Sequence, residues 1–307
     1  MRRGTLVILA LGVLLTGTVN ILSTVIGWLG TPPPSPGPAE LQLPLAGFGE
    51  QVAVDYLSWD SAARPARHAA LARYAEPDAR IDGWDGNGRQ WADSPSTIGI
   101  TANGGSESVV TVRVRIIPAV PAERDTPPPP PSAGVPPEPA PVPGPEAPGW
   151  MAGPARWATL AVPVRTEQGR HLVIAAPVLV GSPPPRVPLP SLPSSNSNED
   201  ATFGTTTREI VLRQLRSYSE GELEFVRASG SSFTGLQRLA TLDRLIRWQA
   251  VTEADANAHT RIGVATVTWQ IAGGVGKITG SYRVELKRQS DRWFLAGVTA
   301  EMGATTP

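Results

Sequence analysis

The sequence contains no cysteine and only two lysines, and it has no net charge, with 27 acidic and 27 basic residues. Without cysteine there is no disulfide framework, no thiolate metal site and no cysteine for the lipid anchor of a lipoprotein. The positive charge is almost all arginine, and it is spread along the chain. Nucleic-acid-binding proteins usually carry a clustered basic surface, so no direct sequence-specific contact with nucleic acid is expected.

Charged residues are also missing from residues 5–29. At about 1.5 Å per helical residue, this run is about 37 Å long, enough to cross a hydrocarbon core of about 30 Å. Signal-peptide apolar regions are shorter and end in small residues, whereas Trp28 suits a membrane interface. We therefore expect a retained transmembrane helix, with a cleaved signal peptide as the alternative. Arg2 and Arg3 predict a cytoplasmic tail at 1–4 and a single-pass protein of the cell membrane whose remaining chain is extracytoplasmic.

Three proline-rich stretches divide the rest of the chain, and none has enough apolar surface to form a core. Polyproline II is stiff and well solvated, so such stretches act as spacers. The predicted order is a stalk at 30–39, a first domain at 40–182 with an insertion at 118–149, a linker at 183–198, a second domain at 199–301 and a tail at 302–307. The reverse assignment, in which the longer stretch joins the domains, stays open.

Helical and strand periodicities alternate in the first domain. Phe48, Val52, Tyr56 and Trp59 recur at spacings typical of one helix face, and the alanine-rich residues 66–75 predict a second helix. Strict alternation then predicts a strand at 108–117, with Val110, Val112, Val114 and Ile116 on one face. Residues 156–166 and 170–180 predict two strands of a hairpin.

The second domain repeats this order. Val211, Leu215 and Tyr218 have helical spacing within 207–228, and strands are predicted at 262–271, 277–288 and 292–300. Residues 164–175 align without gaps to 286–297, which indicates a weak internal repeat. Helices followed by a meander of strands predict an α+β fold, with helices packed on one face of a curved antiparallel sheet.

Two loops resemble ligand-binding motifs but lack required residues. Residues 271–280 resemble a phosphate-binding loop, yet Ile271 replaces its first glycine and Ile278 its hydroxyl residue. A hairpin turn is the better interpretation. Asp82, Asp85 and Asn87 offer oxygens for calcium, but an EF-hand loop begun at Asp85 would end at Ser96 instead of a glutamate. Tight turns are therefore expected here.

The remaining candidate residues also have structural interpretations. The candidates are His68, His171 and His259, which lack metal spacing; Glu220, Glu222 and Glu224, expected at a solvated helix end; and Trp84, Trp91, Trp248, Trp269 and Trp293, expected as core residues although they could line a cavity. No catalytic, cofactor-binding or metal-binding residue is assigned, no cofactor is expected, and the chain is not expected to be an enzyme.

The N-terminal span, the stalk, YLSWD at 56–60, the strand WATLAVPV and the ending RWFLAGV together resemble the TcpC-type conjugal transfer proteins of Gram-positive bacteria. The resemblance implies two domains of the nuclear transport factor 2-like fold, a cone of helices on a curved sheet. It also implies a non-enzymatic assembly role in a type IV secretion machine that moves DNA between cells. The implied partners are the cytoplasmic membrane, other conjugation proteins and further copies of the chain, often as trimers. The insertion at 118–149 departs from the family.

A second class of function stays open from the residues alone. A cone-shaped α+β domain can enclose a pocket, so an extracytoplasmic protein that binds or processes a small ligand is the alternative. A pocket with convergent polar groups would distinguish it from a scaffold. Within the scaffold interpretation, the second domain is expected to contact the partners.

Overall fold

The computed structural model describes residues 38–76, 79–122, 149–181, 199–251 and 259–302. The predicted cytoplasmic tail at 1–4, the span at 5–29, most of the stalk and the linker at 183–198 lie outside these ranges. Within them, no helix combines the length and the apolar character that a membrane crossing needs. The chain divides into two units, Met1–Pro44 and Leu45–Pro307, and both of its sheets belong to the second unit.

The first half forms a seven-stranded sheet with two helices. Its elements are α2 (Pro38–Leu57), β1 (Trp59–Asp60), α3 (Arg64–Ala72), β2 (Arg89–Ala102), β3 (Glu107–Pro121), β4 (Trp150–Ala152), β5 (Arg156–Glu167), β6 (Arg170–Val173) and β7 (Val178–Leu179). The order is β1-β2-β3-β5-β6, with β4 paired to β3 and β7 paired to β5, and every pairing is antiparallel.

The predicted apolar stripes form the core of this half. Val110, Val112, Val114 and Ile116 on β3 have no exposed surface, and neither do Val52 and Tyr56 on α2. Gly49 lets the helix approach the sheet closely, because a Cβ at that position would press on Val110. The prediction that Trp59 continues the helical stripe is wrong. The helix ends at Leu57, and the buried Trp59 belongs to β1.

The predicted insertion at 118–149 overlaps paired strands at its ends. Strand β3 continues to Pro121, and β4 pairs with it from Ala119↔Ala152 to Pro121↔Trp150. The residues on both sides of the 123–148 gap therefore belong to the same sheet. The strand continues because β2 and β4 still pair with it at these residues.

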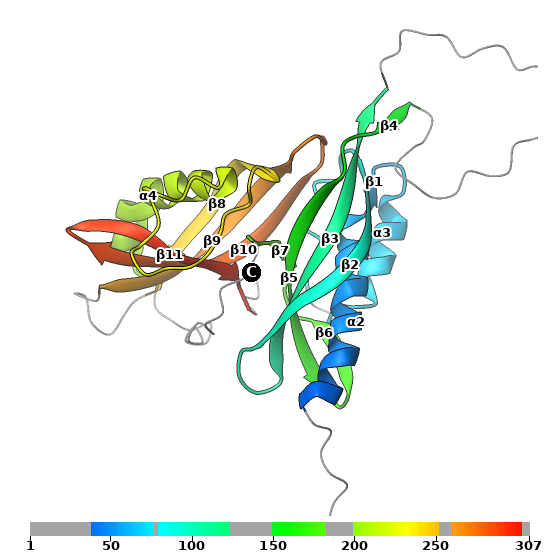
Figure 1. The fold of residues 1–307 in the computed structure, drawn as a ribbon, viewed down its shortest axis with the longest axis horizontal. Helices are drawn as coiled ribbons and strands as arrows, with labels where there is room; N and C mark the ends of the chain where they lie inside the picture. The colour runs from blue at the N-terminus through cyan, green and yellow to red at the C-terminus, as the bar shows by residue number, and fades with distance from the viewer. Residues whose placement is uncertain (1–37, 77–78, 123–148, 182–198, 252–258, 303–307) are drawn as a thin grey trace, which may run out of the picture. The chain divides into compact units, whose positions relative to one another are not determined.

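The second half forms a four-stranded antiparallel sheet with one helix, and Figure 1 shows α4 lying along it. Its elements are α4 (Ala201–Glu220), β8 (Ala240–Ala250), β9 (Thr260–Ile271), β10 (Lys277–Gln289) and β11 (Arg292–Ala300), in the order β11-β10-β9-β8. The Asp200 side chain caps α4 by accepting a hydrogen bond from the Phe203 amide. The helix ends at Glu220, because Gly221 adopts a left-handed conformation with φ 82°.

The internal repeat is confirmed as two hairpins with the same register. Val164 pairs with Val173 in β5–β6, and Leu286 pairs with Leu295 in β10–β11, as the alignment requires. Both turns have two central residues with positive φ, Gln168-Gly169 and Ser290-Asp291, the conformation that suits a two-residue hairpin. Helices packed on antiparallel sheets confirm the α+β class.

Candidate functional site

The two loops that resemble ligand-binding motifs lie against each other and join the two sheets. The Thr279 amide donates to the Gly83 carbonyl over 2.7 Å, and the Asp85 amide donates to the Lys277 carbonyl over 3.0 Å. Trp84 and Ile278 form the bridge between these two bonds. The segment 83–85 thus adds a short antiparallel strand to the first residues of β10, almost 200 positions away in the sequence.

Glycines permit this close approach. A Cβ on Gly83 would overlap the Thr279 carbonyl oxygen, and a Cβ on Gly276 would lie 2.8 Å from the Trp59 indole nitrogen. Packed heavy atoms do not approach each other this closely, so a side chain at either position would force its neighbour to move. The prediction of a turn at 271–280 is confirmed, because β9 and β10 form a hairpin there. The same glycine-rich turn also provides room for contact with the first sheet.

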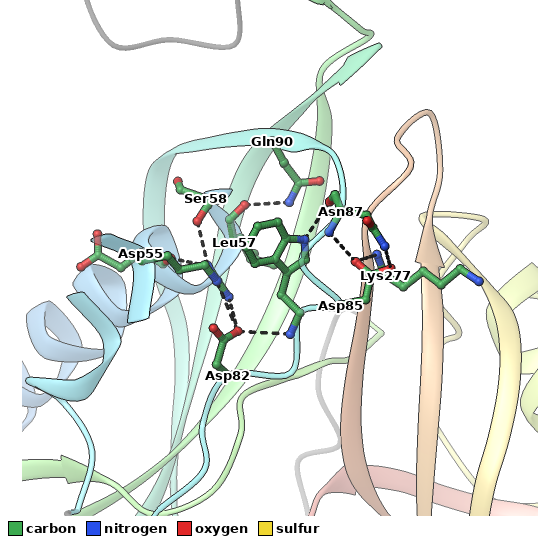
Figure 2. Close-up of polar contacts among 10 residues, drawn as sticks. Asp55, Leu57, Ser58, Asp82, Asp85, Asn87, Gln90 and Lys277 are labelled. Atoms are coloured by element: carbon green, nitrogen blue, oxygen red, sulfur yellow. Dashed lines mark hydrogen bonds and ion pairs between the residues drawn. The ribbon is translucent and has the colours of Figure 1, made fainter. Parts of the chain in front are cut away.

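The acids of the 78–88 segment bind protein groups. The Asp85 carboxylate accepts from the Asn87 amide over 3.0 Å and from the Lys277 amide over 3.2 Å, as Figure 2 shows. Asp82 accepts from the Trp84 amide over 3.1 Å and from Arg67. Asp82 and Asp85 thus serve different partners and stabilise turns, as expected. Among the described residues, no group of three His, Cys, Asp or Glu could hold a metal ion.

Arg67 on α3 is the charged centre of this region, and its side chain is only 4% exposed. Its Nη1 donates to the carbonyl oxygens of Asp55 over 2.9 Å and Ser58 over 2.7 Å, at the C-terminal end of α2. Its Nη2 and Nε donate to Asp82 Oδ1 over 3.0 and 3.2 Å. A helix leaves its last carbonyls without internal donors and has negative potential at that end, so a buried cation there satisfies both needs.

Three aromatic rings surround the same guanidinium. Its Cζ lies 5.5 Å from the ring centroid of Tyr56, 5.8 Å from that of Trp59 and 5.4 Å from that of Trp84. Trp59 and Trp84 also stack on each other, with centroids 6.1 Å apart. Removing an arginine from water costs several kcal/mol, which ring contacts and charge-assisted hydrogen bonds offset. We call Arg67, Asp82, Trp59, Trp84 and the 83–85 segment the arginine junction.

A second contact joins the end of the first sheet to α4. The Gly181 amide donates to the Tyr218 hydroxyl over 2.9 Å in a buried site, and burial raises the pKa of Tyr218. A Cβ on Gly280 would lie 2.6 Å from a Val178 methyl, so β10 also approaches β7 closely. A continuous buried apolar cluster includes residues of both sheets. Backbone pairing, a buried cation and apolar packing therefore hold segments of the chain together in this region.

The histidines and acids that the sequence singled out occupy separate surfaces. His68 on α3 and His259 before β9 are exposed, whereas His171 on β6 packs against Phe48, and burial lowers its pKa. The three glutamates are exposed around the end of α4, as expected, and Glu222 forms an ion pair with Arg238.

The core interpretation of the tryptophans is confirmed for Trp248 and Trp269, which are 6% and 0% exposed. Trp269 donates to the Tyr282 hydroxyl over 2.7 Å inside the second half. Trp84 belongs to the arginine junction, Trp293 packs edge-on against Phe203, and Trp91 is half-buried on β2.

Sequence reasoning missed Arg67 and Glu301. Arg67 shares its helix with Arg64, and Arg73 follows the helix, so no spacing distinguishes it from these exposed arginines. Glu301 follows the last strand and is 6% exposed, and burial raises its pKa to about 7. Its position after an apolar strand was the only available signal.

The two sheets with their helices define a tandem α+β protein, and comparisons with known proteins add little to that description. No protein-family model matches the chain, and no curated protein matches it. Among solved structures, the chain is similar to one described as an "Ntf2 like protein involved in plasmid conjugation", at 14% identity and a TM-score of 0.35. The match covers 86% of this chain and 98% of the other. A likeness at that level supports no conclusion about this chain.

Proposed function

We propose that the chain is a membrane-anchored structural component of a Gram-positive conjugative type IV secretion apparatus. Its two α+β halves are proposed to have the nuclear transport factor 2-like fold and to act outside the cytoplasm through protein–protein contacts. The proposal rests on the sequence resemblance, on the uncharged run at 5–29 behind Arg2 and Arg3, and on the tandem α+β halves.

The arginine junction is the observation that carries the proposal. An assembly subunit must keep its contact surfaces in a fixed arrangement while partners bind to them. Backbone pairing of 83–85 with β10 and the buried Arg67 supply such a connection. These groups bind one another, so their evident use is structural.

Assembly would depend on avidity. A membrane anchor confines the copies to two dimensions, and the stalk sets their height. Contacts that are individually weak then act at a high effective concentration. Homo-oligomers, including trimers, are the expected products, together with complexes containing other conjugation proteins.

Deletion of residues 199–307 tests the role in transfer. In a conjugating Gram-positive host, the truncated chain should reach the membrane fraction but fail to support DNA transfer. A full-length chain carrying Gly47→Ala is the matched control, because a Cβ at Gly47 meets no atom within 4 Å. Undiminished transfer with the truncated chain would refute the role in transfer.

Protease treatment of intact protoplasts tests the topology. Added protease should digest residues beyond the span while leaving an N-terminal fragment in the membrane. The full-length chain in detergent should also have an oligomeric mass by light scattering. A protected C-terminal half, a mature N-terminus after Trp28, or a strictly monomeric full-length protein would contradict the model of an anchored scaffold.

A further inference from the structure

An exposed tryptophan surface lies on the first sheet beside the β3–β4 connection. Trp157 on β5 is 50% exposed, whereas the next residue, Ala158, is completely buried in the core. Arg115 on β3 pairs with Trp157 on one side and with Asp93 on the other. Directly opposed residues of antiparallel strands share a face, so these side chains lie on the face that points away from α2.

A second tryptophan shares this face. Ile117 follows Arg115 by two positions and pairs with Trp91 on β2. Residues two apart on a strand point to the same side, so Trp91, Ile117, Arg115 and Trp157 form one surface. Trp91 and Ile117 are half-buried. We call this set, together with Arg113, the tryptophan face.

The spacing of the tryptophan face matches a polyproline II helix. Trp91 and Trp157 are two strand spacings apart across the sheet, about 10 Å, and two residues apart along it, about 7 Å. Their backbones are therefore about 12 Å apart. A polyproline II helix rises about 3.1 Å per residue, so four residues cover this distance. Proline-rich ligands characteristically dock on aromatic side chains spaced in this way.

Arg113 orients the exposed ring and supplies charge. Its Cζ lies 4.5 Å from the Trp157 ring centroid, and the residue is exposed. Such stacking limits the rotation of the tryptophan and leaves a cation at the edge of the surface. Arg115 is held by Asp93, with Nη2 and Oδ2 2.7 Å apart, so its stem fills the space between the tryptophans. The face therefore suits an acidic, proline-rich ligand.

The chain carries a segment of that composition next to the face. Residues 123–148 contain 12 prolines, four acids and one arginine, a net charge of −3. The stretch begins six residues after Ile117 and two residues after Pro121, the last residue of β3. Its base is closed by a 3.0 Å hydrogen bond from the Ala122 amide to the Gly149 carbonyl. A short tether gives a local concentration on the order of millimolar, enough for a weak ligand.

We propose that the proline-rich stretch 123–148 docks on the tryptophan face of its own chain as a polyproline II helix. Docking covers Trp157 and removes an aromatic surface from contact with other proteins. The proposal does not depend on the conjugation role.

Residue-resolved oxidation of the detergent-solubilised full-length chain tests the docking. A variant in which 126–137 is replaced by an equally long Gly/Ser sequence should expose Trp157 and Trp91, so both should oxidise several-fold faster than in the wild type. Phe225, which is 82% exposed on a loop after α4, should react at the same rate in both proteins. Because the replacement lies outside the sheet, it should leave the fold intact. Equal oxidation of Trp157 in both proteins would overturn the proposal.

A reciprocal experiment measures how accessible the proline-rich stretch 123–148 is to a protease. A glutamate-specific protease should cleave after Glu146, which is followed by Ala147, several-fold faster in Trp157→Ala than in the wild type, with Phe225→Ala as the matched control. The wild-type rate should be independent of protein concentration, because docking is within one chain. Protection that develops only as concentration rises would assign the segment to a second copy and refute docking within the chain. Equal cleavage in all three proteins would refute docking altogether.

Discussion

Ionisation of Glu301 is predicted to weaken the fold as the pH rises from 4.5 to about 7. The residue is 6% exposed at the end of β11, and its amide donates to the Ser281 carbonyl over 3.1 Å. Burial raises the pKa of its carboxyl from 4.5 to about 7, although the positive charge of Arg283 lowers it in part. The folded protein therefore holds this proton over a pH range in which the unfolded chain has lost it.

The sign and size of the effect follow from linkage. Between pH 4.5 and 7 the folded state binds more protons than the unfolded state, so stability falls as the pH rises through this range. At about 1.4 kcal/mol for each pKa unit, the loss is about 3 kcal/mol. Since native proteins are stable by about 5–15 kcal/mol, a change of this size is readily measured.

Glu301→Gln removes the titrating group while keeping its shape. Urea unfolding of the purified chain at pH 5 and pH 8 should give a wild-type difference of about 3 kcal/mol from this residue, and the variant should lose that component. At pH 8 the variant should be the more stable protein. Glu224→Gln, which replaces an exposed glutamate, should leave the pH dependence unchanged. If Glu301→Gln and wild type have the same pH dependence, the carboxyl is not held in a buried site and the reasoning fails.

Three further predictions concern the arginine junction and the contacts between the sheets, and each is tested by urea unfolding. Arg67→Met should lower the free energy of unfolding by about 3 kcal/mol, because it leaves the Asp82 carboxylate without its cation. Arg67→Lys should not restore this stability, because lysine lacks the planar fork. A loss below about 1 kcal/mol for Arg67→Met would contradict the role of Arg67. Gly83→Ala should lower the free energy of unfolding by about 1–3 kcal/mol, because the added methyl group overlaps β10. Gly47→Ala in α2 should raise it by about 0.5–1 kcal/mol. Equal effects of the two substitutions would refute the argument from close approach. Tyr218→Phe should cost about 1–2 kcal/mol by leaving a buried amide unpaired, and a neutral result would exclude that hydrogen bond.

Strands with strict alternation were predictable from the sequence, and bulged strands were not. On β3, Val110 to Ile116 alternate with polar residues, and all four apolar residues are buried. Strand β2 contains Pro95 and has register shifts on both sides of Ser96 and Thr97, which destroy a period of two. Strand β8 has two such shifts and was missed for the same reason. Its burial pattern follows the partner strand instead of its own sequence.

The arginine junction was beyond sequence reasoning for a different reason. Glycines at 83 and 276 signal turns, but only Gly276 lies in one, the β9–β10 hairpin connection, whereas Gly83 belongs to the extended segment that pairs with β10. Their second use, letting two segments meet, depends on a pairing between positions almost 200 residues apart. The burial of Arg67 requires the end of α2, the 81–88 segment and α3 at once. Local sequence patterns do not report contacts between segments that are far apart in the chain.

The pairing of 83–85 with β10 also bears on how the chain can be divided. The first residues of β10 have β9 on one side and this borrowed segment on the other. A C-terminal fragment beginning near residue 199 would keep every one of its own strands and still present bare amides and carbonyls along that margin. Unpaired sheet edges recruit other chains, so such a fragment should aggregate. The same fragment mixed with a separate peptide of residues 79–88 should stay in solution.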